Sequence, residues 1–183
     1  GDAPIVDEIP HIGAGYSYLV KGDMRLNPEH PPLAKDLAGI GVLSLDFTDR
    51  VFTIPQWTSE VNGQWEFGRQ LIFHSGVHPD TVKNFARFPL FAFFFVGAWL
   101  MWRGSQERYG DRAALITVTL FAFSPTILAH MRFVTTDMAA AVTVLASTYC
   151  FVHFLRHQTR ATFLWASLTL GLALLAKFNT VLL

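Results

Sequence analysis

The chain has 183 residues, of which 51% are hydrophobic, 14% are aromatic and only 15% are charged. With a mean hydropathy of +0.33, this composition argues against a water-soluble globule. The 14 basic and 14 acidic residues cancel, so the chain lacks the surplus of Lys and Arg that nucleic-acid binding requires. Nucleic acid is therefore excluded as a partner. The single cysteine, Cys150, cannot form an intrachain disulfide.

The charges are distributed unevenly along the chain. Residues 1–87 contain 11 acidic and 7 basic side chains, whereas residues 88–183 contain 3 acidic and 7 basic ones. A polar first part therefore precedes an apolar second part. The chain opens without Met or a signal segment and stops in an apolar stretch, so we expect it to be an excerpt of a longer protein.

Residues 1–83 are predicted to form a structured extracytoplasmic loop, because they are too rich in apolar side chains for disorder. A first helix is expected after Asp7, which is a good N-cap, and Gly22 is expected to close it. A second should begin at Pro31-Pro32 and be amphipathic, as in juxtamembrane helices. Four aromatic residues are expected where the protein meets the lipid headgroups: Trp57, Trp65, Phe67 and Phe73.

The second part contains four long intervals without charge, of 15, 19, 18 and 16 residues. A spanning helix needs about 20 mostly apolar residues, so the second and third intervals suffice alone. The first and last can be extended past Arg87 and Lys177. We therefore predict an all-α integral membrane protein in which residues 84–183 form four transmembrane helices, near 84–102, 113–131, 138–155 and 162–183. The core of a soluble protein is the alternative for these apolar runs.

The orientation of the predicted helices follows from their short loops. Cytoplasmic loops are enriched in Arg and Lys, and five arginines lie in the first and third loops: Arg103, Arg108, Arg112, Arg156 and Arg160. The sequence thus predicts an inner-membrane protein with residues 1–83 outside. The turn from Arg132 to Asp137 should face the same, extracytoplasmic side, although Arg132 itself goes against the rule.

Nine ionisable residues are brought to this extracytoplasmic level by the predicted topology alone. Charge close to hydrocarbon is costly unless it is paired, hydrated or used, so such a gathering indicates a functional site. Asp7 and Asp137 also fit plain helix caps, Glu29-His30 a solvated turn and Arg87 an interface anchor. The nine are Asp7, Glu8, His11, Glu29, His30, Lys35, Arg87, Arg132 and Asp137.

Several motifs resemble a known enzyme family. They are Asp7-Glu8-x-x-His11, the run from Gly22-Asp23 through Asn27-Pro28-Glu29-His30-Pro31-Pro32 to Lys35, Ala86-Arg87-Phe88-Pro89, the run from Phe123-Ser124-Pro125 to Thr135-Thr136-Asp137, and Gly171 to Phe178. In this order they are similar to the family 39 glycosyltransferases, the protein O-mannosyltransferase-like and aminoarabinose-transferase-like enzymes, over nearly the whole chain.

The resemblance implies a C-type glycosyltransferase fold, of which this chain is a fragment, because the family has one more helix before the acidic loop and several after Leu183. It also implies transfer of a sugar from a polyprenyl-phosphate donor to a protein hydroxyl or a lipid or glycan acceptor, with inversion. The aminoarabinose branch often has Lys where this chain has His30, which suggests a different donor.

The same resemblance places Asp7 at the acceptor as catalytic base, with Glu8 orienting it. Positive charge is needed beside the departing phosphate, and the residues expected to bind substrate and phosphate are His11, His30, Lys35, Arg87 and Arg132. If a divalent ion (Mg²⁺, Mn²⁺ or Zn²⁺) assists, Asp137 with Glu29 or His30 are the expected ligands.

Two other function classes are compatible with a membrane protein of this kind. A transporter or channel would use intramembrane acids as an ion path, but it should carry charge near the bilayer midplane, where the four intervals have none. A non-catalytic membrane subunit would use the loop to bind a partner.

Overall fold

A computed structural model describes residues 3–60 and 62–182 of the chain. The described residues contain helices and turns but no strand, which confirms the predicted all-α class. They divide into two compact units. Unit 1 runs as far as Leu90 and also includes Phe133–Thr135, and unit 2 consists of Phe91–Arg132 and the residues from Thr136 onward.

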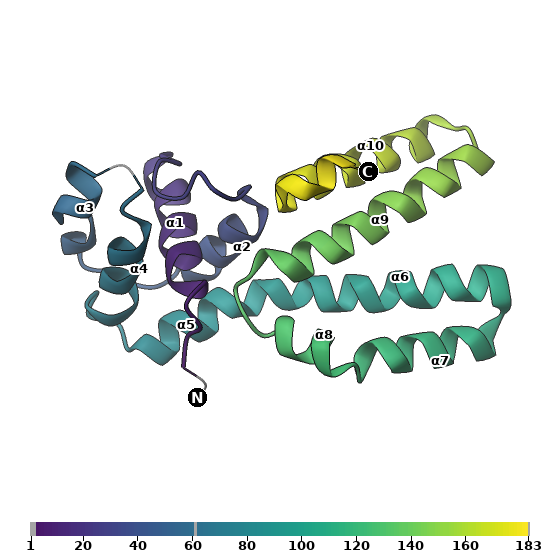
Figure 1. The fold of residues 1–183 in the computed structure, drawn as a ribbon, viewed down its shortest axis with the longest axis horizontal. Coiled ribbons are helices and arrows are strands. Elements are labelled where there is room, and N and C mark those ends of the chain that lie inside the picture. Colours follow the sequence, from purple (N-terminus) through teal and green to yellow (C-terminus); the bar gives the residue numbers. More distant parts are fainter. Residues whose placement is uncertain (1–2, 61, 183) are drawn as a thin grey trace. The chain divides into compact units, whose positions relative to one another are not determined.

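Unit 1 is built around its first helix, which contacts both the second and the fourth (Figure 1). The second helix in turn contacts the fifth. The helices are α1 (Glu8–Lys21), α2 (Leu33–Val42), α3 (Pro55–Thr58), α4 (Gln64–Phe73) and α5 (Pro79–Arg87), with short 3-10 segments η1 (Asp49–Phe52) and η2 (Phe88–Leu90).

Local sequence signals set the ends of α1 and α2. Gly22 adopts φ of +65°, a left-handed conformation in which its N–H bonds the Tyr18 carbonyl at 2.9 Å, and α1 ends there as predicted. The α2 helix begins directly after Pro31-Pro32, also as predicted. Asp7 does occupy the N-cap position of α1, but its side chain makes no capping hydrogen bond, so the prediction that it caps the helix is wrong.

Glycines let α1 approach both of its neighbours closely. A Cβ on Gly15 would overlap the backbone carbonyl of Lys35 on α2, and one on Gly68 of α4 would overlap the carbonyl of Ile9 on α1. A side chain at either position would push the helices apart. The close packing of α1 therefore depends on these two residues.

An aromatic cluster fills the core of unit 1. Phe67 is fully buried with Tyr18 and Leu26, and Phe52 and Trp57 pack against them. Phe67 was predicted at the membrane interface, and for this residue the prediction is wrong, because its ring is fully buried in the core of unit 1. Trp57 is partly buried, and its place at the interface stays a prediction. Trp65 and Phe73 are 41% and 43% exposed.

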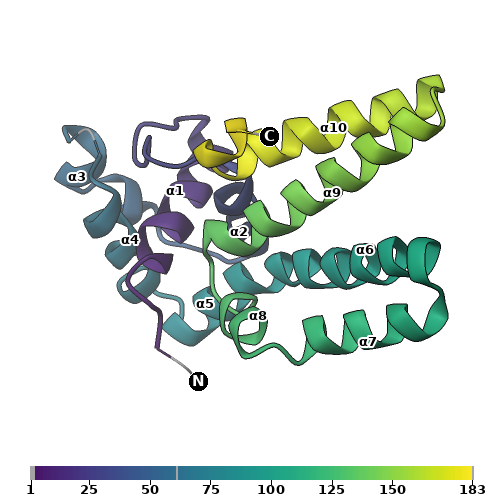
Figure 2. The same cartoon turned by 45° about the vertical axis from the view of Figure 1, so that its right-hand side comes forward.

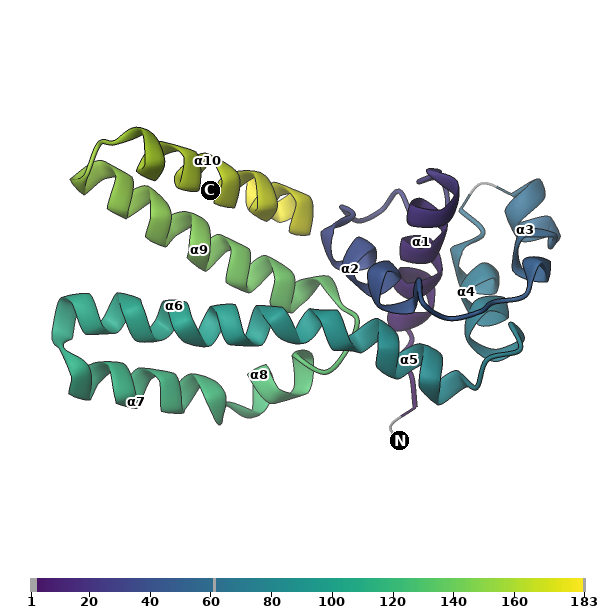
Figure 3. The ribbon, with the colours of Figure 1, turned by 180° about the vertical axis from the view of Figure 1, so that it is seen from behind.

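Unit 2 consists of two antiparallel helix pairs. One pair is α6 (Phe91–Tyr109) with α7 (Asp111–Ala122), the other is α9 (Thr136–Arg156) with α10 (Arg160–Ala176), and α6 also contacts α9. The short α8 (Pro125–His130) precedes α9, and η3 (Phe178–Leu182) follows α10. The turns that close the two pairs lie at the same end of the unit in Figures 2 and 3.

Two of the four predicted membrane spans have the required length and composition. They are the helical run Pro79–Tyr109 and the helix Thr136–Arg156. The α10 helix is apolar but shorter, since it stops at Ala176 and Lys177 has extended backbone with φ of −157°. The predicted continuation of this helix to residue 183 is therefore wrong.

The predicted span at 113–131 is also wrong as a single helix. The α7 helix ends at Ala122, and α8 starts afresh at Pro125 after an extended Ser124. Proline disfavours helical backbone at the residue before it and lacks the N–H that a continuous helix would need. The 12 residues of α7 rise only about 18 Å, short of the roughly 30 Å of a bilayer core.

Candidate functional site

A buried ion pair joins the first turn of α1 to the last turn of α5. Glu8 is fully buried and Arg87 is 8% exposed. The guanidinium donates from Nε to Glu8 Oε1 at 2.7 Å and from Nη2 to Oε2 at 2.6 Å. Such two-pronged contacts are strong and fix the relative orientation of both side chains. The pair therefore locks the beginning of α1 against the end of α5.

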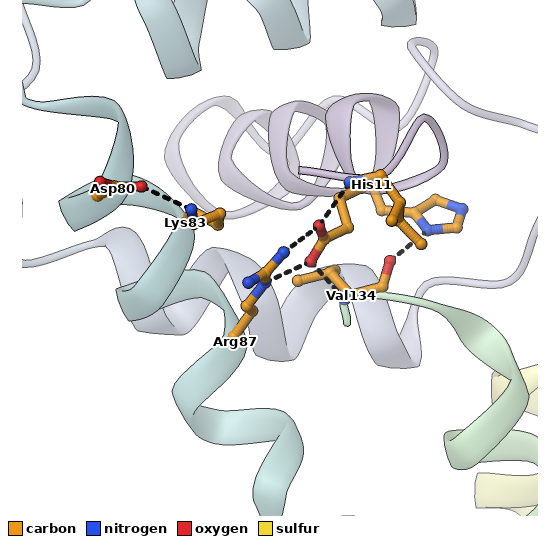
Figure 4. A network of polar contacts seen from close by, with 7 residues as sticks. His11, Asp80, Lys83, Arg87 and Val134 are labelled. Atoms are coloured by element: carbon orange, nitrogen blue, oxygen red, sulfur yellow. Dashed lines mark hydrogen bonds and ion pairs between the residues drawn. The ribbon is translucent and has the colours of Figure 1, made fainter. Parts of the chain in front are cut away.

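The segment Phe133–Thr135 completes this network. Val134 donates its backbone N–H to Glu8 Oε1 at 2.9 Å, and its carbonyl lies 3.0 Å from His11 Nδ1. Because a carbonyl can only accept, His11 donates from Nδ1 in this contact. Figure 4 shows His11, Arg87 and Val134 meeting at this point. Burial lowers the pKa of His11, so its ring is neutral at pH 7.

Glu8 has no spare acceptor capacity in this arrangement. Its Oε2 accepts a further hydrogen bond from the Ile5 N–H at 3.0 Å, so the carboxylate takes four in all. The Arg87 guanidinium also lies over the Phe133 ring, 5.0 Å from its centroid. Both charged groups are thus engaged within unit 1.

Lys35 stands at the centre of a second polar cluster. Its side chain is almost fully buried, and Nζ donates to the carbonyls of Asn27 at 2.8 Å and His30 at 2.6 Å and to the Tyr18 hydroxyl at 3.0 Å. Burial lowers the pKa of Lys35 to about 8 and raises that of Tyr18 to about 12. The ammonium therefore holds residues 27–30 against α1 and α2.

Asn27 and Gln64 connect this cluster to Glu29. Asn27 donates to Gln64 Oε1 at 2.5 Å, and Gln64 Nε2 donates to Glu29 Oε1 at 3.2 Å. Asn27 and Gln64 are both buried. Neither residue was predicted as a site residue, although Asn27 stands in one of the quoted motifs, because an uncharged amide can be buried without an ionic partner.

Three further side chains lie beside these networks. Asp7 is exposed, whereas His30 is partly buried with its ring edge-on to His11 at 5.6 Å. Thr135 is 6% exposed, and its hydroxyl has no hydrogen-bond partner among the described residues. Thr135 was not among the predicted site residues. A buried hydroxyl without a hydrogen-bond partner destabilises the fold. This cost marks Thr135 as a candidate functional residue, which the sequence alone does not reveal.

Unit 2 contains the two remaining predicted site residues. Arg132 is exposed after α8. Asp137 lies in the first turn of α9, where Lys177 Nζ donates to its Oδ1 at 2.8 Å and His130 Nδ1 lies 3.8 Å from its Oδ2. Lys177 was not among the predicted site residues.

Each predicted metal ligand has protein partners of its own in the structure. Asp137 is paired with a lysine ammonium, and Glu29 accepts from two side-chain amides, those of Asn62 and Gln64. No group of three or more His, Cys, Asp or Glu side chains gathers in the part of the chain described. The divalent ion stays a prediction.

The family model for dolichyl-phosphate-mannose-protein mannosyltransferase matches residues 80–183. No curated protein and no solved structure matches the chain. The matched region covers more than half of the chain. It includes Thr136–Arg156 and all but the first residue of Pro79–Tyr109, the two helical runs with the length of a membrane span. The chain therefore belongs to the dolichyl-phosphate-mannose-protein mannosyltransferase family, whose members are membrane-bound glycosyltransferases.

Proposed function

We propose that the chain transfers a sugar from a polyprenyl-phosphate donor to a hydroxyl of a protein, lipid or glycan acceptor, on the extracytoplasmic side of the cell membrane. The family match supports the donor class. Asp7 is the proposed general base, which takes the proton of the acceptor hydroxyl. The acceptor oxygen then bonds to the anomeric carbon, the bond from that carbon to the phosphate oxygen breaks, and polyprenyl phosphate leaves. A single displacement of this kind inverts the anomeric centre.

The contrast between Asp7 and its neighbour is the observation that carries this proposal. Glu8 is fully buried and takes four hydrogen bonds, whereas Asp7 is exposed and makes no capping bond. Among the described residues, Asp7 neither caps the helix nor forms an ion pair with a basic side chain, so its carboxylate is available to a substrate. The rigid anchoring of Glu8 one residue away holds the backbone of Asp7 in place, so Glu8 acts as a positioning residue.

The contacts of unit 1 also refine the proposed phosphate partners. The Lys35 ammonium and the Arg87 guanidinium both satisfy buried acceptors of the protein, so we assign them positioning roles, as we do His11. His30 and Arg132 are more accessible and are the proposed contacts of the donor phosphate. Positive charge there would stabilise the leaving group.

The test is a transfer assay with the full-length protein in proteoliposomes and polyprenyl-phosphate sugars as donors. Asp7→Asn should lower kcat by at least about 100-fold, the usual contribution of a general base. The control is His78→Ala, which removes the α5 N-cap contact to the Asp80 N–H at 3.3 Å and should keep near-native transfer. Undiminished activity of Asp7→Asn would remove the base assignment, and no transfer from any polyprenyl-phosphate sugar would remove the donor class.

The metal requirement is tested separately in the same assay. The protein is dialysed against a chelator and then supplied with Mg²⁺, Mn²⁺ or Zn²⁺. Activity that is lost and restored by one ion would support the predicted site, with Asp137→Asn expected to weaken the restoration. Activity that survives chelation would mean that the chain's own cations balance the phosphate charge.

A further inference from the structure

Unit 2 contains an apolar groove that the proposed transfer reaction does not use. It has a volume of about 420 Å³ and is formed by α6, α9 and α10. Apolar side chains make up most of its wall, among them Trp99, Trp165 and Ala146, and Tyr149 and His153 also line it. Trp99 and Trp165 are 55% and 60% exposed. Such a surface suits a hydrocarbon chain.

One end of the same unit is rich in arginine. The α6–α7 turn region, residues 103–112, holds three arginines and two acids, and residues 156–160 hold two arginines and no acid. The end of the unit where both helix pairs turn (Figure 3) therefore contains five positively charged and two negatively charged side chains. Both acids are engaged: Glu107 pairs with Arg103 at 2.9 Å, and Asp111 accepts from Gln106 at 2.8 Å.

Side-chain contacts link the groove to this charged end. Tyr149, in the groove wall, donates to Glu107 Oε1 at 2.8 Å, the oxygen that also pairs with Arg103. From Tyr149 a row of rings runs along α9 toward the turn, with His153 stacked on Tyr149 at 6.4 Å and His157 next to His153 at 4.7 Å. A molecule in the groove would therefore have its polar end beside arginine and histidine side chains.

We propose that this groove binds an anionic phospholipid of the bilayer, with an acyl chain between α6, α9 and α10 and the phosphate near Arg103 and Arg160. The occupant follows from charge complementarity. Basic pockets between helices at the membrane surface select anionic headgroups, and the arginine distribution predicts that this end faces the cytoplasm, where anionic lipids face basic segments. A zwitterionic lipid would gain little from the surplus of positive charge.

The test uses photoreactive phosphatidylglycerol and phosphatidylcholine, each with a diazirine in the acyl chain, and the full-length protein in nanodiscs. Crosslinked peptides are mapped by mass spectrometry. Phosphatidylglycerol should label the groove segments of α9 and α10 at least about fivefold more than phosphatidylcholine, and Arg103→Gln with Arg160→Gln should abolish that preference. The control Arg69→Gln, at an exposed pair on α4, should leave it unchanged.

A second pair of variants tests the groove itself. Ala146→Phe fills the groove and should lower its labelling about fivefold, whereas Ala141→Phe, at an exposed position of the same helix outside the groove, should not. The proposal is overturned if both lipids label the native groove equally, or if neither labels it because another protein segment covers it. Displacement of phosphatidylglycerol by an equimolar amount of polyprenyl phosphate would also overturn it, in favour of the donor lipid. The comparison of lipids on native protein stands even if Ala146→Phe does not fold.

Discussion

Glu8 accepts a hydrogen bond of 2.9 Å from the backbone N–H of Val134, a residue 126 positions further along the chain. The same carboxylate holds the Arg87 guanidinium. Three segments that are remote in sequence thus meet at one buried acid. This acid lies directly beside the exposed Asp7, so the structural anchor and the proposed base are neighbours in the chain.

The Glu8–Arg87 pair should be essential for stability. Glu8→Gln leaves the buried guanidinium without a countercharge, and breaking a buried pair in this way costs about 3–5 kcal/mol. The measurement is the thermal unfolding midpoint of the full-length protein in detergent. As a matched control, Glu107→Gln breaks an ion pair whose side chains are 45% and 30% exposed, and exposed pairs contribute less than about 1 kcal/mol. If both variants lowered the thermal unfolding midpoint equally, the Glu8–Arg87 pair would not be the buried, stabilising contact that the structure shows.

Gly15→Ala should destabilise unit 1 because its methyl group would overlap the Lys35 carbonyl. Overpacking of this kind costs about 1–3 kcal/mol. Gly171→Ala is the matched control, since a Cβ there meets nothing within 4 Å inside a regular helix, and alanine should raise stability there by up to about 1 kcal/mol. Thermal unfolding of both variants gives the comparison, and a neutral Gly15→Ala would show that α1 and α2 are less closely packed.

Lys35 should make stability depend on pH in the alkaline range. Its pKa in the folded chain is about 8, below its ordinary value near 10.5, so between these values the unfolded chain binds more protons than the folded one. The free energy of unfolding contributed by Lys35 should therefore rise as pH increases from about 8 toward 10. The slope is measured against Lys35→Met, which lacks the titrating group. If the free energy of unfolding depended on pH equally in the native protein and in Lys35→Met, the Lys35 ammonium would be more hydrated than the structure indicates.

Thr135→Val should separate stability from activity. Valine has nearly the shape of threonine, and it removes a buried hydroxyl that has no partner in the described structure. Such a group costs about 1–3 kcal/mol, so the variant should unfold at a higher temperature. We expect transfer to slow, because uncompensated polar groups persist mainly where a ligand uses them. An unchanged transfer rate would show that the hydroxyl has no substrate contact.

Local features of the fold could be predicted from the sequence because short-range chemistry decides them. Gly22 ends α1 through its left-handed backbone, Pro31-Pro32 precedes α2, and the uncharged run at 138–155 forms a long apolar helix. The uncharged run around Pro125 predicts a continuous helix, but in the structure the helix is broken there, because proline disfavours helical backbone at the residue before it.

The sequence by itself determined that this is an all-helical membrane protein of a glycosyltransferase family, because apolar run lengths and ordered motifs depend only on residues near one another in the chain. Only the tertiary structure decided which charges are used internally. The sequence alone does not distinguish the charged residues Glu8, Lys35 and Arg87 from Asp7 and Arg132. The first three are buried in the structure, and a buried charge is costly unless it has hydrogen-bond or ionic partners. Partners such as the Val134 backbone carry no sequence signal, since every residue has the same N–H and carbonyl.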